Sequence, residues 1–282
     1  MEITITCNAV ATQQTSALLL LFAPPAAEKF AAFNLSQPTS YFSYVKPLIQ
    51  HGDFHGRSRE LFWLYPENLP AKRLLLSGIG KEQEESKLDG PFLQRIIANA
   101  IAACRRLSVK ELCIPLAGAL LDQFPPTRAA QLIVEAALLA NYQFTRYKTR
   151  SDKNTSALAT LTLLLEDDKH ATAIREGAHS GKILGTWTCH ARDLQNTPAN
   201  DLSPSRFAEL AQEQAETVGL ACEVWDEMKI REEKMGALLG VAQGSPQPPR
   251  FVILEKNAEA KEQPTLVLIG KGVTFDSGGL AI

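Results

Sequence analysis

Two neighbouring segments indicate the fold class: KRLLLSGIG over residues 72–80 and GPFLQRIIANAIAACRR over residues 90–106. The first part is an apolar run that ends in a glycine turn, which predicts a buried strand. The second part carries apolar residues at helical spacing, from Leu93 through Ile97 to Ile101, which predicts an amphipathic helix. A strand, a loop and a helix in this order indicate an α/β layer with parallel strands.

The same alternation continues on both sides of this unit. The further elements predicted there are strands over 2–6, 16–22, 109–116 and 159–165 and a helix over 127–141. An acidic turn, Glu166-Asp167-Asp168, follows the last of these strands and is more typical of a solvated linker than of a carboxylate pair. We therefore expect an amino-terminal α/β domain over residues 1–168.

A second α/β domain is predicted over residues 169–282. It opens with a long helix over 171–193, which the sequence Asn196-Thr197-Pro198 should stop. Ser203 and Pro204 have the pattern of an N-cap and a first helical residue. The remaining predicted elements are strands over 222–225, 250–255 and 265–269 and a helix within 227–240.

Composition narrows the class of protein. The 282 residues are 45% hydrophobic and 21% charged with a net charge of −2, which argues against disorder and against attraction of the whole chain to nucleic acid. The five cysteines form no CxxC pair and are expected to be reduced. The apolar run 17–27 contains two prolines, is too short for a bilayer and follows no basic segment, so we expect a cytoplasmic protein without a membrane segment.

The segment whose residues are the best candidates for a ligand or metal site reads TLVLIGKGVTFDSGG over residues 265–279. It is predicted to be a buried strand followed by a glycine-rich loop with Lys271 and Asp276, and ligands of open α/β sheets bind at the carboxyl ends of strands. The spacing matches neither GxGxxG nor a phosphate loop. On shape alone the loop is either a surface turn with an ion pair or a place where both side chains converge on one ion.

The full string GKGVTFDSGG over 270–279 resembles the metal-binding signature of the leucyl aminopeptidases, peptidase family M17. Shorter matches precede it in the family's order: ARDL at 191–194, NTP at 196–198, MGALL at 235–239, QGS at 243–245 and PR at 249–250. Tyr142, Phe144 and Tyr147-Lys148 also resemble the end of the family's amino-terminal domain. The resemblance covers most of the chain.

The resemblance implies two α/β domains, the second a partial, mixed-sheet catalytic domain like that of zinc exopeptidases. It implies a cytosolic, homo-hexameric aminopeptidase that removes leucine-like residues from the amino terminus of peptides. Two divalent ions per subunit, Zn²⁺ or Mn²⁺, would activate water, with bicarbonate in the complete site. Lys271 matches the lysine ligand and Asp276 matches the aspartate between the metals. A lysine binds a cation as the neutral amine, which burial and a nearby dication favour.

The family's pattern continues past the second glycine to a catalytic lysine seven residues after the aspartate, beyond residue 282. Further ligands and an arginine that helps to bind bicarbonate follow it. We therefore expect this sequence to be a fragment that is inactive by itself, and no catalytic residue is assigned within it. Only Lys271 and Asp276 are carried over as metal ligands.

A non-catalytic module that binds nucleic acid or a partner protein is the alternative. Some members of the resembled family bind DNA, and basic residues that could contact phosphate lie at Arg105, Arg106, Arg146, Lys148, Arg150 and Lys153. The net charge does not support this alternative. The five histidines form no HExxH or HxH pattern and are expected to have structural or surface roles.

Overall fold

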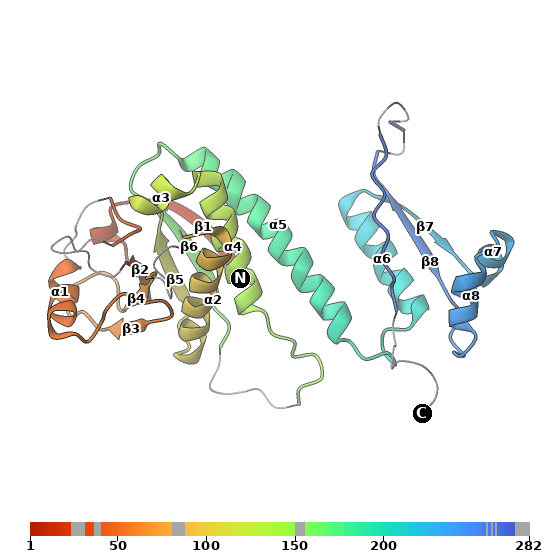
Figure 1. The fold of residues 1–282 in the computed structure, drawn as a ribbon, viewed down its shortest axis with the longest axis horizontal. Helices are drawn as coiled ribbons and strands as arrows, with labels where there is room; N and C mark the ends of the chain where they lie inside the picture. Colours follow the sequence, from red (N-terminus) through yellow and green to blue (C-terminus); the bar gives the residue numbers. More distant parts are fainter. Residues whose placement is uncertain are drawn as a thin grey trace. The chain divides into compact units, whose positions relative to one another are not determined.

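The computed structural model describes residues 1–23, 32–36, 41–80, 88–149, 156–257, 259–260, 262 and 264–273. The chain forms two compact units, Met1–Ala191 (unit 1) and Arg192–Ile282 (unit 2), and each combines helices with a sheet (Figure 1). This confirms the predicted α/β class. The boundary between the units falls within the sequence of helix α5 (Ala171–Asn196), whereas the predicted domain limit at residue 168 lies before that helix and stays a prediction.

Unit 1 contains a six-stranded sheet in the order β1-β6-β5-β2-β4-β3. Its strands are β1 (Glu2–Cys7), β2 (Leu18–Phe22), β3 (Leu61–Leu64), β4 (Leu74–Gly78), β5 (Glu111–Pro115) and β6 (Thr160–Leu165). All neighbours are parallel except β3, which runs antiparallel to β4. The five parallel strands confirm the predicted ones. Strand β3 was not predicted, because its four residues show no alternation of polar and apolar side chains.

Helices cover both faces of this sheet. Leu19 and Leu21 of β2 pack in one hydrophobic cluster with α2 (Gly90–Arg106), α4 (Pro126–Asn141) and the first turns of α5. Leu18 and Leu20 pack in a second cluster on the other face with α1 (Phe42–His51), a helix that was not predicted. Strand β2 is buried along its whole length, as its continuous apolar run predicts. Two short helices, η1 (Val10–Thr12) and α3 (Ala119–Gln123), complete unit 1.

Three glycines on one face of α5 let it pack closely on α4. A Cβ atom at Gly177 would lie 2.0 Å from the carbonyl oxygen of Thr127, and one at Gly181 would lie 2.5 Å from that of Gln131. Gly185 continues the same face one turn later. The first half of α5 therefore packs against α4 within unit 1, with the two backbones in close contact.

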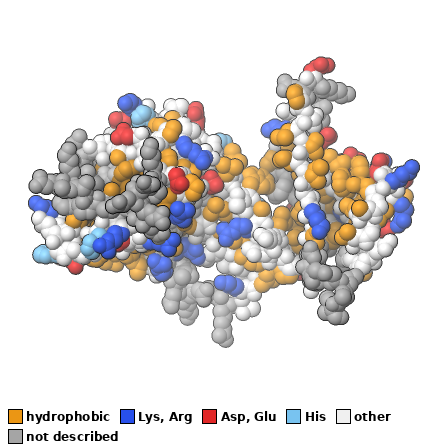
Figure 2. Space-filling view, in the orientation of Figure 1, with side chains coloured by type: hydrophobic (Ala, Val, Ile, Leu, Met, Phe, Trp, Pro, Cys, Tyr) orange, Lys and Arg blue, Asp and Glu red, His pale blue; other side chains and the backbone are white. Residues whose placement is uncertain are grey.

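Unit 2 is built from α6 (Pro204–Val218), β7 (Ala221–Trp225), α7 (Glu227–Glu232), α8 (Gly236–Ala242) and β8 (Phe251–Glu255). Strands β7 and β8 form an antiparallel pair, and α6 packs against both. The hydroxyl of Ser203 accepts a hydrogen bond from the backbone N–H of Arg206 at 3.3 Å, which confirms the predicted N-cap. Figure 2 shows apolar side chains spread over the visible surface of this unit.

The strand predicted over 265–269 is wrong for the described structure. These residues have no regular secondary structure, and the side chains of Leu266, Leu268 and Ile269 are 84%, 88% and 92% exposed. A strand needs a hydrogen-bonded neighbour, and the described sheet of unit 2 contains only β7 and β8. An apolar run predicts burial correctly only where neighbouring strands or helices cover its side chains.

Candidate functional site

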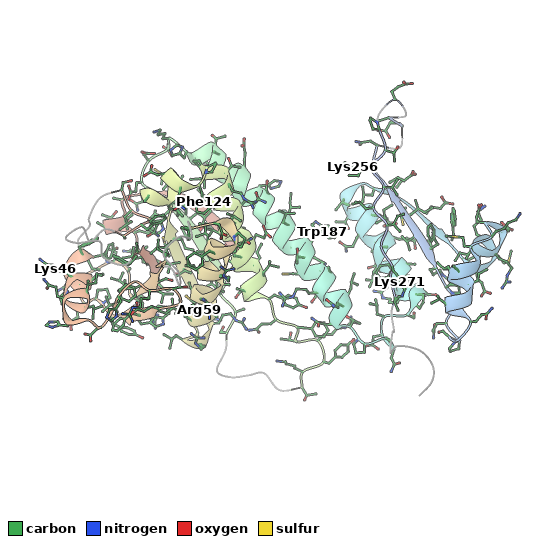
Figure 3. All side chains as sticks on the ribbon, viewed as in Figure 1. Lys46, Arg59, Phe124, Trp187, Lys256 and Lys271 are labelled. Carbon is green, nitrogen blue, oxygen red and sulfur yellow. The ribbon has the colours of Figure 1, made fainter. Side chains whose placement is uncertain are left out.

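Lys271 lies directly after the exposed apolar segment, in unit 2 beside α6 (Figure 3). The neighbouring Gly272 approaches the ring of Phe207 on α6, where a Cβ atom would lie 3.8 Å from the ring. The Lys271 side chain is exposed. Asp276 and the rest of the glycine-rich loop lie outside the described residues, so the convergence of Lys271 and Asp276 stays a prediction.

Within the described ranges, no group of three or more His, Cys, Asp or Glu side chains is placed to hold a metal ion. Lys271 alone cannot form a metal site, because even a catalytic zinc normally takes three protein ligands. The described residues therefore provide one of the two predicted ligands and not a complete ligand set.

Unit 1 has its own conventional ligand position, at the carboxyl ends of β2 and β5. The chain leaves β2 through α1 on one face of the sheet and leaves β5 through α4 on the other face. Open α/β sheets bind ligands where neighbouring strands diverge in this way. The two strands are paired only at Leu18 and Cys113, so their ladder opens toward this end.

The side chain of Asn34 fills the opening. It is fully buried, its Nδ2 donates to the carbonyl oxygens of Leu19 at 3.1 Å and Pro115 at 3.2 Å, and its Oδ1 accepts from the N–H of Leu21 at 3.0 Å. These bonds replace ladder bonds between β2 and β5. The place where such a sheet would hold a ligand is occupied by the protein itself. Sequence reasoning missed Asn34, because a single asparagine between elements carries no signal for this role.

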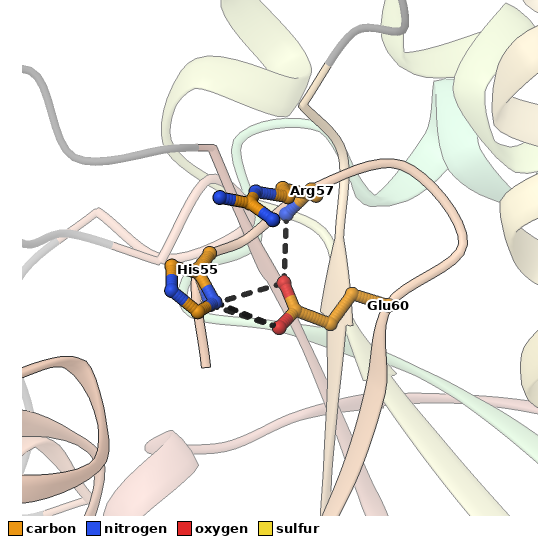
Figure 4. Close-up of polar contacts among 3 residues, drawn as sticks. All are labelled: His55, Arg57 and Glu60. Carbon is orange, nitrogen blue, oxygen red and sulfur yellow. Dashed lines mark hydrogen bonds and ion pairs between the residues drawn. The ribbon is translucent and has the colours of Figure 1, made fainter. Parts of the chain in front are cut away.

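The loop between α1 and β3 packs across the carboxyl ends of β2 and β4. The carboxylate of Glu60 accepts from the backbone N–H groups of His55 at 3.0 Å and Arg57 at 2.9 Å, and it lies 3.4 Å from Nδ1 of His55 (Figure 4). Partial burial raises the pKa of Glu60, but these hydrogen bonds and the His55 ring outweigh it, so the pKa is lowered. The contacts give His55 the structural role that the sequence predicts.

The predicted basic residues that the structure describes lie at the end of α2 or after α4, toward the amino-terminal ends of the parallel strands. Arg105, at the end of α2, donates from Nη1 to the carbonyl oxygen of Ala140 at 2.9 Å. The guanidinium of Arg146 lies 5.6 Å from the centre of the Tyr147 ring. Arg150 and Lys153 lie outside the described residues. The arrangement combines cations with an exposed aromatic ring.

None of the five cysteines, all of which the structure describes, forms a disulfide, as expected for reduced thiols. Cys104 and Cys113 are buried in unit 1, and burial raises the pKa of each thiol to about 12. Thiols of this kind are unreactive at neutral pH and act as small apolar side chains.

Comparison with known protein families gives two matches in one family. The model of the cytosol aminopeptidase family, N-terminal domain, matches residues 21–151, and the model of its catalytic domain matches residues 189–282. The chain belongs to the cytosol aminopeptidase family. The catalytic-domain match includes Lys271, Asp276 and the glycine-rich loop.

Relatives within the cytosol aminopeptidase family are similar over most of this chain. A probable cytosol aminopeptidase of Roseiflexus castenholzii is 37% identical over 88% of the chain and 50% of its own length. The cytosol aminopeptidase of Pseudomonas aeruginosa is 34% identical over 84% of the chain and 48% of its own length. The chain thus spans about half the length of these curated relatives.

Solved structures show the same fold. A variant of tomato leucine aminopeptidase superposes with a TM-score of 0.70 at 22% identity, over 89% of this chain and 50% of its own. The bottromycin maturation enzyme BotP, solved in complex with Mn, superposes with a TM-score of 0.62 over 85% of this chain and 45% of its own. Among the described residues of this family member, no helix is long and apolar enough to cross a membrane.

Proposed function

We propose that this chain is part of a metal-dependent aminopeptidase that releases leucine-like residues from the amino terminus of peptides. The observation that carries the proposal is the string GKGVTFDSGG, which lies inside the region matched by the family's catalytic domain. The names of the curated relatives support the same reaction. Asn34 occupies the usual ligand position of the unit 1 sheet, which favours a site in unit 2 over one in unit 1.

Lys271 and Asp276 are the proposed metal ligands. Lys271 would contribute a neutral amine and Asp276 a carboxylate, both of which donate electron pairs to a divalent cation. Two Zn²⁺ or Mn²⁺ ions held by these and further ligands would supply Lewis acidity for polarising the scissile carbonyl and for activating water. The complex of BotP with Mn supports manganese as one candidate. The remaining ligands and the bicarbonate site are proposed to belong to the complete protein.

The cellular setting follows the same proposal. We propose a cytoplasmic enzyme that acts on peptides and assembles as a homo-hexamer when complete. The names of the relatives support the location. The 282-residue chain by itself is proposed to be inactive.

Metal binding by the complete protein, which would supply the remaining ligands, tests the two ligands. We expect titration calorimetry of that protein with MnCl₂ to show binding that weakens at least tenfold in Asp276→Asn and in Lys271→Gln. Asp226→Asn is the control, because Asp226 caps α7 elsewhere in unit 2. Equal Mn²⁺ affinity in all four proteins would refute the ligand assignment.

Intact mass and hydrolysis of leucine p-nitroanilide test the activity. A protein of 30.9 kDa is expected to show no hydrolysis with added Mn²⁺ or Zn²⁺, whereas a longer natural product is expected to show metal-dependent hydrolysis. Hydrolysis by the 30.9 kDa chain would show that the residues carried over here suffice. A longer product without metal-dependent hydrolysis would contradict the aminopeptidase proposal.

Nucleic-acid binding is the second candidate function. The amino-terminal edge of the unit 1 sheet pairs cations with exposed rings: Arg73 lies 6.0 Å from the centre of the Tyr65 ring, and Arg146 lies next to Tyr147. Tyr65 is 62% exposed. Cations beside accessible rings can contact phosphates while bases stack on the rings.

Binding of a fluorescent single-stranded oligonucleotide at two salt concentrations tests this candidate. We expect Tyr65→Ala to weaken binding about tenfold, since stacking is worth roughly 1–3 kcal/mol per base. Tyr44→Ala, on α1, is the matched control. The absence of oligonucleotide binding at low salt would contradict nucleic-acid binding as a function of this chain.

A further inference from the structure

The two edges of the unit 1 sheet differ in how they are protected. Strand β3, at one edge, has four residues and is followed by Tyr65 and Pro66, which shorten the pairing surface. Strand β1, at the other edge, has six residues in unbroken register with β6, from Glu2 opposite Thr160 to Cys7 opposite Leu165. It contains no proline, no lysine and no bulge, which are the common protections of an edge.

The outward-facing groups of β1 follow from its bonds to β6. The N–H of Glu2 donates to Ala159 and the N–H of Asn8 donates to Leu165, so the even-numbered residues face β6. The N–H and C=O groups of Ile3, Ile5 and Cys7 therefore point away from the sheet. Within the described part of the chain, none of these outward groups has a backbone partner. Strand β1 is thus a template for another strand.

We propose that β1 pairs with β1 of a second copy of this chain, antiparallel, about a two-fold axis at Thr4. A two-fold axis normal to the sheet keeps each face on its own side, so only residues on the same face can be opposite. Centring on Thr4 places Ile3 opposite Ile5 of the partner copy, and their outward N–H and C=O groups then exchange both hydrogen bonds. The two sheets would join into one.

Side-chain chemistry makes this register self-complementary. Ile3 and Ile5 lie on the face that packs against the cluster of α2, α4 and α5, so an apolar pair extends that cluster across the axis. On the other face, Glu2 lies opposite Thr6, and no two like charges are opposite. Thr4 is held by a hydrogen bond between its Oγ1 and that of Thr162 at 2.8 Å. The register therefore pairs an isoleucine with an isoleucine on one face and Thr4 with its own copy on the other.

A disulfide test measures the register directly. Thr4 would form a non-hydrogen-bonded pair, with Cα atoms roughly 4.5 Å apart, which suits a disulfide. In a Cys7→Ser background, which removes the exposed thiol at the end of β1, we expect Thr4→Cys to form a covalent dimer joined at position 4 on mild oxidation. Thr6→Cys is the matched control on the same face, because the two copies of that residue would lie roughly 13 Å apart. Equal cross-linking of both variants, or none, would overturn the proposal.

Backbone removal provides the second test. Proline at position 5 deletes an outward N–H and leaves the bonds to β6 in place, while alanine causes a similar loss of packing and keeps the N–H. We expect sedimentation of the chain at about 100 μM to show halved mass for Ile5→Pro and the wild-type assembly for Ile5→Ala, with far-ultraviolet circular dichroism retained in both. The same mass for both variants would contradict the pairing. Neither test uses metal or peptidase activity, so its result is separate from the proposed function.

Discussion

Units 1 and 2 both contain capped helices and apolar strands, but their apolar side chains are buried to different degrees. Both hydrophobic clusters lie in unit 1, where helices cover both faces of the sheet. In the described part of unit 2, the buried apolar side chains are Leu202, Ala208, Ala215 and Ile230. Capped helices and apolar strands can therefore form locally, whereas a core requires elements on both sides of a sheet.

Two apolar runs make the comparison specific. Residues 18–22 read LLLLF and residues 266–269 read LVLI. The first run lies between β4 and β5 and is buried throughout, whereas the second is exposed and unpaired among the described residues. Hydrophobicity is alike in the two runs, so the neighbours alone decide the outcome. The following changes test whether stability resides in unit 1 as this comparison implies.

Gly78→Ala should have the largest effect. A Cβ atom there would lie 1.9 Å from the carbonyl oxygen of Arg57, so the loop or the strand must move. We expect unit 1 to lose about 3 kcal/mol of unfolding free energy, the size of severe overpacking. Gly236→Ala in unit 2 is the control, because nothing lies within 4 Å of its Cβ position. Urea unfolding followed by circular dichroism measures the stability of both variants. Equal unfolding midpoints for Gly78→Ala and Gly236→Ala would contradict the view that stability resides in unit 1.

Asn34→Ala should come next. The change leaves the buried N–H of Leu21 and the buried carbonyls of Leu19 and Pro115 without their side-chain partner. We expect a loss of roughly 2–3 kcal/mol, since unsatisfied buried polar groups are costly. Asn200→Ala, at an exposed turn in unit 2, should change stability by less than about 0.5 kcal/mol. An Asn34→Ala variant as stable as wild type would show that the opening between β2 and β5 tolerates water.

Removing a helix N-cap in each unit should have a smaller effect and compares the two units directly. Asp89 caps α2 in unit 1 by accepting from the N–H of Phe92 at 2.8 Å, and Ser203 caps α6 in unit 2. Each alanine variant should cost its helix about 1 kcal/mol. We expect Asp89→Ala to lower the unfolding free energy of unit 1, and Ser203→Ala to speed hydrogen exchange only within α6. A loss of unit 1 stability in Ser203→Ala would show that the two units unfold together.

The smallest effect concerns acid stability. The pKa of Glu60 is lowered in the folded chain, so its carboxylate stabilises unit 1 above the unfolded pKa of about 4.3. This contribution is lost as the pH falls through the lowered folded value. We expect Glu60→Gln to destabilise unit 1 at pH 7 by less than about 1 kcal/mol and to have a smaller effect at pH 3. Urea midpoints at the two pH values measure this, and an effect independent of pH would contradict it.

The local sequence pattern was sufficient to predict most helices and strands, but it did not predict the roles of particular residues. The helical spacing of Leu93, Ile97 and Ile101 predicted α2, and Ser203 predicted the start of α6. Strand β3 was missed because four residues are too few to show a period. The role of Asn34 was missed because its three partners lie on two strands that are remote from each other in sequence. For the candidate site, the motif predicted Lys271 and Asp276, and their convergence stays a prediction.

The α/β class, the family resemblance and the glycine-rich loop with its lysine and aspartate follow from the order of the amino acids. Those conclusions depend on periodicity and on residues that are close along the chain. Three further features become visible only in the folded chain: Asn34 closes the ligand position of unit 1, Gly78 has no room for a side chain, and residues 265–269 lie exposed. These outcomes depend on which distant segments meet, because hydrogen bonding and burial are satisfied between elements and not within them.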